Sequence, residues 1–432
     1  MRLKRLLLWG GAVVTCSLVA FSGGSVLATN DEARFDALKR LSHVLDLVER
    51  SYVREVPRKD LVSGAIKGML QGLDPHSTFL STEEFKEMQE TTSGEFYGVG
   101  IEISTENGQL TVVSPIEDTP AYKAGLKAGD LILAVDGAPA QEMTTQEAVS
   151  RIRGAKGTEV ELTILHRDAK APRTVRIVRD AIPLISVKSK QLEAGYYWLR
   201  LTRFSERTTP ELMDALKDAG KHGPLKGIVL DLRNNPGGLL DQAVSVSDAF
   251  LNQGAIVTIR GRAEEAVREY KAKEQSTDVT VPMVVLVNAG SASASEIVAG
   301  ALRDHKRALI LGERSFGKGS VQNIIPLPDG SGLKLTVALY YTPNGRSIQA
   351  EGIEPDIEVP FEAPREDDGK VASRFGMVRE KDLSRHLENG SGGKGGKGTG
   401  TAPEAKEQLE KDNQLRMALQ FVKRLPALRD IR

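Results

Sequence analysis

The chain has 432 residues, enough for two or three compact units, because a single hydrophobic core stops growing beyond about 250–300 residues. Hydrophobic residues make up 40% and charged residues 27% of the chain, which is typical of a soluble protein. The 58 basic residues are balanced by 58 acidic residues. Without a basic excess, the composition predicts no nucleic-acid partner.

The N-terminal segment has the pattern of a secretory signal. Three cations among the first five residues precede an apolar stretch, 6–21, which is followed by small residues and Ala28. We therefore predict a signal peptide over residues 1–28 and an exported protein of the periplasm or another extracytoplasmic compartment. The alternative is an uncleaved membrane anchor through residues 6–28, because this stretch carries no charge and is long enough to span a bilayer.

The only cysteine, Cys16, lies inside this apolar segment. A lipidated Cys16 is weakly supported, since Val-Val-Thr before it matches such a signal poorly. A chain cleaved after residue 28 would contain no thiol. Cysteine nucleophiles, cysteine-based zinc sites and disulfides are then excluded.

Residues 29–95 are predicted to form an N-terminal helical region. Apolar residues recur at steps of three and four over 35–52, which is one helical stripe, and a second helix is expected over 60–71. The sequence LDPHSTFL, 73–80, predicts a turn. Ser81, with a glutamate three residues later, predicts a capping box that opens a further helix. The stripe indicates a helical domain core or, alternatively, a face for a partner or a second copy.

The pattern changes twice further along the chain. Over 96–180, short β-type runs are separated by Gly, Asp and Pro, with one helix at 145–153 introduced by Thr144 and a glutamate three residues later. Over 181–362, apolar strands alternate with helices, which predicts an α/β unit with a buried sheet. Residues 363–432 are charged and then Gly-rich, which is typical of a linker. They end in a stretch with helical spacing that predicts a docked terminal helix.

Three strands of the α/β unit are followed by sequences that could contain catalytic residues. In NAGSASASE, 288–296, a buried strand runs into a helix through three serines. A serine at such a turn is exposed at the edge of the sheet, and the N–H groups that open the helix can stabilise an oxyanion. A serine is also a common helix N-cap, so the motif alone leaves a purely structural role open.

The second sequence is SFGKGSVQ, 315–322, in which glycines flank Lys318. A lysine can act as a general base only when it is neutral. Its pKa would have to fall from about 10.4 to roughly 7, which corresponds to about 4 kcal/mol. Burial between the flanking strands could supply this stabilisation, whereas an ordinary loop lysine would be exposed.

The third sequence is the turn NNPGG after the strand 226–233. Glycines let backbone N–H groups approach a ligand closely. Gly237 or Gly238 could therefore provide a second oxyanion donor beside the amide of Ala294. The alternative is an ordinary strand-to-helix turn.

Two other enzyme classes receive little support. GERSFGKGS, 312–320, approaches a phosphate-binding loop, but Gly319 stands where a magnesium-binding Ser or Thr is needed, and a strand follows it. A Ser–His–Asp triad would need a histidine near the serine turn, and His305, the nearest in sequence, ends a helix. No HExxH motif is present, so a zinc peptidase has no support.

Taken together, NAGSASASE, SFGKGSVQ, DLRNNPGG and TPNGRSIQAEGIEPD resemble the carboxy-terminal processing, or tail-specific, serine proteases over residues 35–360. The resemblance implies that Ser293 is the nucleophile and Lys318 the general base. Gln322, four residues after the lysine, would orient it. The resemblance also implies a crotonase-like α/β protease core and no metal or organic cofactor.

Residues 96–180 resemble a PDZ domain, with TPAYKAGLKAGDLILAVDG, 119–137, as the strongest match. The sequence GVGI stands at the carboxylate-binding loop, whose N–H groups would hold a chain terminus. The helix at 145–153 would form the other wall of the groove. The predicted binding residues are Gly98, Val99, Gly100, Ile101, Ala148, Val149 and Ile152, although some of the last three could belong to the core.

The sequence thus predicts a multidomain α/β serine endopeptidase that acts on proteins or peptides with an apolar free C-terminus. Homo-oligomers through the terminal helices and a regulatory adaptor are compatible with this organisation. The alternative from another class is a PDZ adaptor that binds tails without catalysis, but a scaffold would have no need of the set Ser293, Lys318 and Gln322.

Overall fold

The computed structural model describes residues 35–106, 109–167, 169–263, 266–275, 279–362, 409 and 411–429. The predicted signal peptide and the Gly-rich linker lie outside these residues. Within the described part of the chain, no helix has the length and apolarity needed to cross a membrane.

The unit that ends at Leu73 is helical where the sequence predicted helices. Residues 35–51 form one helix, and α2, Arg58–Gln71, forms another. Apolar side chains of both helices, among them Leu38 and Met69, are largely exposed. The apolar stripe is therefore real, but within its own unit it does not build a closed core.

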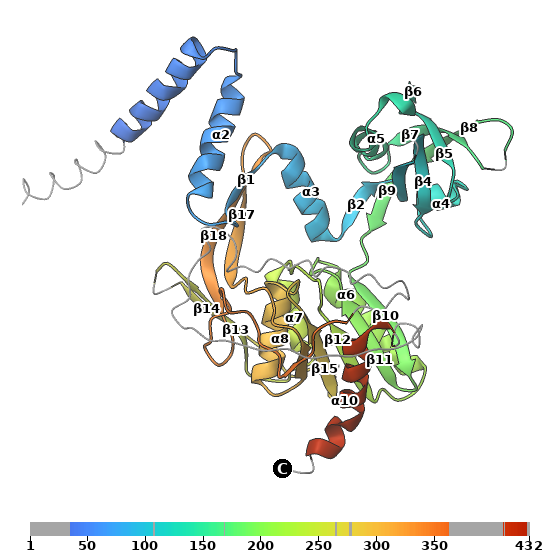
Figure 1. Ribbon diagram of the computed structural model, residues 1–432, viewed down its shortest axis with the longest axis vertical. Coiled ribbons are helices and arrows are strands. Elements are labelled where there is room, and N and C mark those ends of the chain that lie inside the picture. Colours follow the sequence, from blue (N-terminus) through green and yellow to red (C-terminus); the bar gives the residue numbers. More distant parts are fainter. Residues whose placement is uncertain are drawn as a thin grey trace, which may run out of the picture. The chain divides into compact units, whose positions relative to one another are not determined.

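The second unit contains a six-stranded sheet, and parallel pairing dominates it (Figure 1). Only the edge strand pairs antiparallel. In spatial order the strands are β10 (Val187–Glu193), β11 (Tyr196–Leu201), β12 (Gly227–Asp231), β15 (Met283–Val287), β16 (Leu309–Gly312) and β19 (Ile357–Glu358). The central strands β12 and β15 are buried along their whole length, which confirms the predicted α/β layering.

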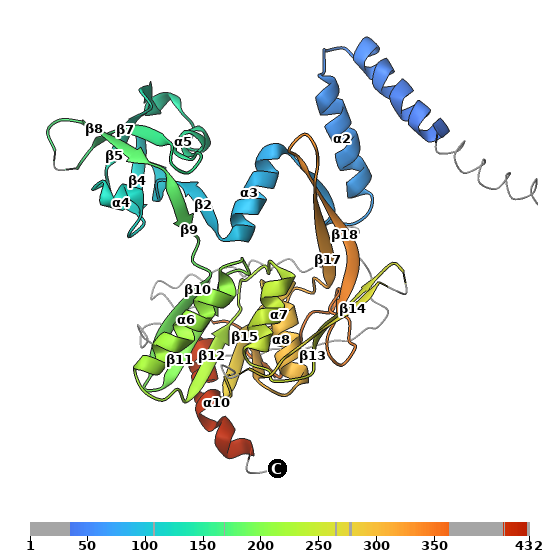
Figure 2. The same cartoon turned by 180° about the vertical axis from the view of Figure 1, so that it is seen from behind.

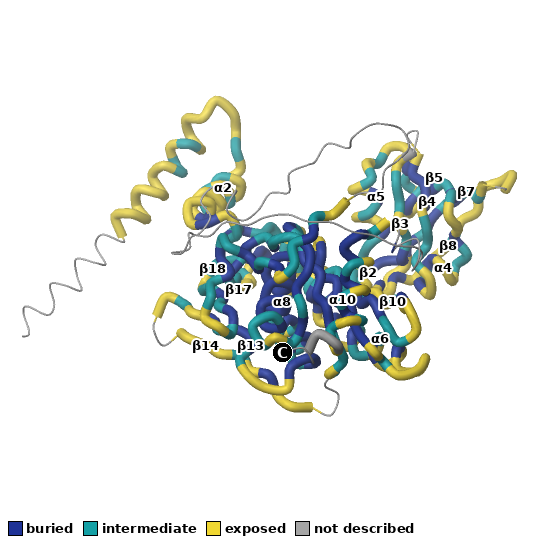
Figure 3. Tube along the Cα trace, turned by 60° about the horizontal axis from the view of Figure 1, so that its bottom comes forward, coloured by how far each residue is buried: buried dark blue, intermediate teal, exposed yellow. Residues whose placement is uncertain are grey.

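Helices lie on both faces of these central strands (Figure 2), and alternate strand residues pack against different helices. One layer consists of α6 (Thr208–Lys221), α7 (Leu240–Asp248) and α8 (Ala294–Asp304). Leu230 packs in the core with these helices, while its neighbour Val229 packs with α10 (Asn413–Arg429). The predicted terminal helix therefore docks on its own chain. Figure 3 shows the buried positions along α8 and α10.

A second sheet flanks this core and carries the long hairpin β17–β18. Its strands are β1 (Thr78–Leu80), β13 (Ala255–Gly261), β14 (Val267–Lys271), β17 (Ser320–Pro326) and β18 (Gly332–Tyr341). The prediction of a turn over 73–80 was wrong for its last three residues, because these pair with residues 332–334 of β18. Long-range pairing of this kind leaves no local signal. The capping box of Ser81 with Glu84 is confirmed at the start of α3 (Thr82–Ser93).

Residues between two short paired strands, β2 (Glu95–Gly98) and β9 (Asp180–Pro183), form a small β-rich domain. Its strands are β3 (Ile101–Glu106), β4 (Gln109–Pro115), β5 (Leu131–Val135), β6 (Ala138–Pro139), β7 (Glu159–Leu165) and β8 (Arg173–Val178). Its helices are α4 (Pro120–Lys123) and α5 (Thr145–Ile152), with a short 3-10 turn at Ala140–Glu142. The predicted capping box of Thr144 with Glu147 opens α5.

The docking of α10 predicts a stability effect. Leu419 is buried with strand residues of the sheet, while the next residue, Gln420, is exposed. We expect Leu419→Ala to lower the free energy of unfolding by about 2–5 kcal/mol, because it leaves a cavity. Gln420→Ala is the matched control and should change it by less than about 0.5 kcal/mol. Denaturant unfolding measures both, and equal values would show that α10 is not docked in solution.

Candidate active site

Ser293 occupies the turn between β15 and α8 and has an unusual backbone conformation. Its φ is 55° and its ψ is −111°, a region that residues with a side chain rarely adopt. It stands at the N-cap position of α8 and is only 7% exposed. Conformations of this kind persist where the surroundings impose them, and they cluster at functional sites.

The neighbouring serines hold the turn in place. The Ser291 hydroxyl donates to the Leu232 carbonyl oxygen at 2.8 Å, and the Ser295 hydroxyl donates to the Asn235 carbonyl oxygen at 3.0 Å. Both acceptors follow β12, which pairs in parallel with β15, so the carboxyl ends of the two strands meet. Ser291 and Ser295 therefore join the two turns through their hydroxyl groups, and they hold the turn on both sides of Ser293.

The glycine turn after β12 lies directly against Ser293. A Cβ on Gly237, whose φ is 98°, would lie 2.7 Å from the Ala292 carbonyl oxygen and 2.8 Å from the Ser293 Cβ. Only glycine fits there. The Gly237 N–H donates to the Asn235 Oδ1 at 2.9 Å. The second oxyanion donor, Gly237 or Gly238 beside the amide of Ala294, stays a prediction.

Lys318 lies where the sequence placed it, on a loop between β16 and β17, and it is half-buried. The loop reaches the serine turn through the backbone, because the Phe316 N–H donates to the Ser291 carbonyl oxygen at 3.0 Å. Immediately after Lys318, the Gly319 N–H donates to the Gln349 Oε1 at 2.9 Å. Both sides of the lysine are thus fixed by hydrogen bonds.

Glu296 joins the serine turn to the lysine loop, and the sequence reasoning missed this role. Its fully buried carboxylate accepts the Ser293 N–H at 2.8 Å and the Lys318 N–H at 2.9 Å. It also accepts the Gly317 N–H at 2.7 Å and the Ser315 hydroxyl at 2.5 Å. The available signal was a glutamate three residues after a helix-capping serine, which by itself predicts only a cap.

The ionisation of Glu296 is finely balanced. Burial raises its pKa from 4.5 to about 7, against the opposing effect of the hydrogen bonds from Ser315 and the three backbone N–H groups. The Ser315 oxygen itself accepts the Ile353 N–H at 2.6 Å, so its proton is directed to Glu296. All four partners therefore donate, and the arrangement suits the ionised carboxylate.

Tyr340, near the end of β18, contacts the side chain of Ser293 by a hydrogen bond. Burial raises the pKa of its hydroxyl to about 12, partly offset by this contact. A phenol with this pKa is neutral at neutral pH and cannot act as the base. It can hold the Ser293 hydroxyl in a defined rotamer.

Gln322 lies near the start of β17 and is half-buried. Its Nε2 donates to the Ser320 Oγ at 2.9 Å and to the Thr336 Oγ1 at 3.4 Å. The amide is therefore held by the hairpin β17–β18. Its orienting action on Lys318 stays a prediction.

A histidine triad finds no support in this geometry. His305 caps the C-terminal end of α8, whereas Ser293 stands at its N-terminal end. The helix has 11 residues, so about 16 Å separates its two ends. The His305 Nε2 is hydrogen bonded to the Ala255 carbonyl oxygen at 2.6 Å.

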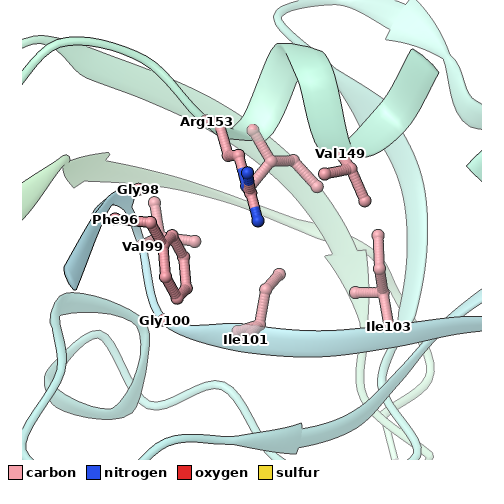
Figure 4. Close-up of a pocket in the computed structure, with 9 residues that line it drawn as sticks. Phe96, Gly98, Val99, Gly100, Ile101, Ile103, Val149 and Arg153 are labelled. Atoms are coloured by element: carbon pink, nitrogen blue, oxygen red, sulfur yellow. The ribbon is translucent and has the colours of Figure 1, made fainter. Parts of the chain in front are cut away.

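A second candidate site is a cavity of about 150 Å³ between β3 and α5 of the small β-domain (Figure 4). Six of the seven residues predicted to bind a chain terminus line it, joined by three that the sequence reasoning missed. The lining residues are Phe96, Gly98, Val99, Gly100, Ile101, Ile103, Val149, Ile152 and Arg153. Ala148 packs in the domain core instead. It precedes Val149 by one residue on α5, so its side chain leaves the helix on a different side from the face that Val149 and Arg153 share.

Arg153 is the charged group of this cavity. Its guanidinium lies over the Phe96 ring, 4.8 Å from the centroid, and pairs with the Glu90 carboxylate at 3.0 Å. The cavity thus combines an apolar wall, a glycine-containing loop and one cation.

Comparisons with known proteins agree with this geometry. A model of peptidase family S41 matches residues 195–359, a PDZ-domain model matches 111–165, and a model of the N-terminal domain of the activating protease CtpB matches 22–84. The carboxy-terminal-processing protease of Bartonella bacilliformis is 44% identical over 416 residues, which cover 96% of this chain and 94% of that protein. The chain belongs to the carboxy-terminal processing proteases of peptidase family S41.

A second curated relative agrees with this assignment, and a solved structure shows a partial likeness. The carboxy-terminal processing protease CtpA of Bacillus subtilis is 39% identical over 80% of this chain and 75% of its own length. Among solved structures, the photosystem II D1 C-terminal processing protease is 33% identical, covers 74% of this chain and 92% of its own, and has a TM-score of 0.43. As a member of this family, the chain is a serine peptidase with a PDZ domain, and its substrates are proteins or peptides.

The bridging carboxylate of this protease gives a direct test. We expect Glu296→Gln to lower kcat roughly 10- to 100-fold, because a side-chain amide has one acceptor oxygen and its NH₂ end would face backbone N–H groups. Peptide cleavage at equal concentrations of folded enzyme measures the effect. Glu206→Gln, at an exposed glutamate, is the control and should leave kcat unchanged. Full activity of Glu296→Gln would contradict the bridging role.

The same variant tests the pKa of Glu296. With a pKa of about 7 folded and 4.5 unfolded, the carboxyl binds more protons in the folded state between these values. Its contribution to stability is therefore fully present below about pH 4.5 and is lost as the pH rises through about 7. We expect the unfolding free energy of the wild type, relative to Glu296→Gln, to fall across this range. A difference that stays constant with pH would refute the raised pKa.

Proposed function

We propose that the protein is an exported endopeptidase that cleaves peptide bonds with Ser293 as the nucleophile and Lys318 as the general base. The observation that carries the proposal is the Glu296 carboxylate, which accepts the backbone N–H groups of both residues. It connects the serine turn and the lysine loop directly, although the two lie in different connections of the sheet.

The reaction would proceed in two steps. The Ser293 hydroxyl attacks the scissile carbonyl while the neutral Lys318 amine accepts its proton. The amides of Ala294 and of Gly238, or Gly237, would stabilise the oxyanion, and the lysine would return the proton to the leaving amine. Water then hydrolyses the acyl-enzyme. Each oxyanion donor typically contributes 10²–10³ in rate.

The PDZ domain would recognise the C-terminal tail of the substrate. The loop Gly98–Ile101 lines the cavity, its N–H groups would hold a terminal carboxylate, and an extended tail would pair with β3. Ile103 and Val149 form an apolar wall for the last side chain. The preferred substrates would thus end in an apolar residue with a free carboxylate.

The wider organisation is part of the same proposal. We take residues 1–28 as a signal peptide, 29–95 as a helical region, 96–180 as the PDZ domain, 181–362 as a crotonase-like protease core and 363–432 as a linker with a terminal helix. Export follows from the signal. The exposed apolar residues of the N-terminal helices favour a homo-oligomer, and a regulatory adaptor is compatible with the same surface.

The dyad is tested by cleavage of an unfolded protein that ends in apolar residues. We expect Ser293→Ala and Lys318→Ala to reduce cleavage at least 10³-fold, because each removes a group that acts in bond breaking. Lys217→Ala, at an exposed lysine on α6, is the control and should cleave at the wild-type rate. Equal cleavage by wild type and Ser293→Ala would overturn the proposed mechanism.

Tail recognition is tested by binding, with Ser293→Ala protein so that the peptide stays intact. A fluorescent peptide with a free apolar C-terminus should bind at least about tenfold more tightly than the same peptide with an amidated end, since the amide removes the charge that the loop would hold. Fluorescence anisotropy measures both affinities. Equal affinities would exclude carboxylate capture.

A further inference from the structure

Asp74 is a buried carboxylate that has no place in the mechanism above. It is 5% exposed and accepts four hydrogen bonds. The donors are the N–H groups of His76 at 2.8 Å and Ser77 at 2.9 Å, the Ser77 hydroxyl at 2.7 Å and the Thr336 hydroxyl at 3.1 Å. The last contact joins residues 262 positions apart in the sequence.

These contacts keep Asp74 ionised. Burial alone would raise its pKa, but the hydrogen bonds from Ser77, His76 and Thr336 together lower the pKa below its ordinary value. Lys334 on β18 adds a positive charge that interacts with the same carboxylate. An ionised carboxylate can only accept, so Thr336 must direct its single hydroxyl proton to Asp74.

The direction of that proton makes the Thr336 oxygen one of the acceptors that orient the neighbouring amide. With its proton committed to Asp74, the Thr336 oxygen can only accept from Gln322, whose Nε2 lies 3.4 Å away. The carbonyl oxygen of Ser320, 3.3 Å from the same Nε2, is also an obligatory acceptor. The NH₂ end of the Gln322 amide is therefore turned toward these two oxygens and toward the Ser320 Oγ, its shortest contact at 2.9 Å, and Oε1 is turned away from them.

We propose that Asp74 is a positioning residue, which acts through Thr336 to hold the Gln322 amide with its carbonyl oxygen toward the Lys318 amine. This inference rests on the proposed Ser293–Lys318 mechanism. A carbonyl oxygen accepts an N–H of the lysine and leaves the amine lone pair for the proton of Ser293. The reversed amide would present N–H groups, which would compete for that lone pair and would repel the protonated amine.

A purely structural role makes different predictions. The bonds from His76 and Ser77 to Asp74 are local and close the turn before β1, whatever happens at Gln322. The Ser77 hydroxyl also accepts the Thr336 N–H at 3.0 Å, so the turn would stay attached to β18 without the Thr336 hydroxyl. The Thr336 side chain is therefore the point at which positioning and folding can be separated.

The test compares Thr336→Val, which removes the hydroxyl, with Thr336→Ser, which keeps it. Kinetics on one defined peptide should show about a tenfold loss of kcat for Thr336→Val with KM within about twofold, and a kcat for Thr336→Ser within about twofold of wild type. Asp74→Asn should resemble Thr336→Val. Thr258→Val, on the adjacent strand β13, is the matched control and should retain full kcat.

Thermal unfolding of every variant accompanies the kinetics. Wild-type kcat in Thr336→Val would overturn the inference, and so would an equal loss in Thr336→Ser, which would indicate packing of the methyl group. A loss of kcat that is accompanied by a lower melting temperature would show a structural role of Thr336 and would overturn the inference as well. If Asp74→Asn fails to fold, the comparison of Thr336→Val with Thr336→Ser still tests the positioning role. Cleavage by Ser293→Ala at the wild-type rate would instead defeat the underlying mechanism.

Discussion

The candidate site depends on one buried carboxylate placed where two connections of a parallel sheet meet. Glu296 lies in the first turn of α8, where the helix dipole favours a negative charge, and its oxygens accept N–H groups from the serine turn and from the lysine loop. Without this acceptor, several buried N–H groups would be left unsatisfied at a cost of about 1–3 kcal/mol each. The same interaction therefore stabilises the fold and sets the distance between the two loops.

The second organising element is strand β18. Its Tyr340 contacts the side chain of Ser293, and its Thr336 connects Asp74 with Gln322. The pairing of β18 with β17 shifts register between these two positions, so one strand supports both the nucleophile and the amide beside the lysine. The hairpin partner β17 begins two residues after Lys318, and a displacement of the hairpin would therefore disturb all of these groups together.

Local sequence features predicted much of this fold, because their causes are local. The two capping boxes, the apolar strands after which the motifs stand, and the terminal helix all follow from residue type and period. The motifs also indicated the family. What the sequence could not show were contacts between distant segments: the Glu296 bridge, the pairing of β1 with β18, and the Asp74–Thr336 bond. In each case the local pattern predicted a cap or a turn, and only the tertiary fold supplied the partner.

The two carboxylates act on different parts of the lysine. Glu296 binds the backbone N–H of Lys318 and so fixes where the loop lies, whereas Asp74 is linked through two hydrogen bonds to an amide proposed to face the amine. Loop position and amine orientation are thus separable. A change at the backbone anchor should move the lysine and weaken the fold, because buried N–H groups lose their acceptor. A change at the amide should leave the loop in place and alter only the direction in which the amine can take a proton.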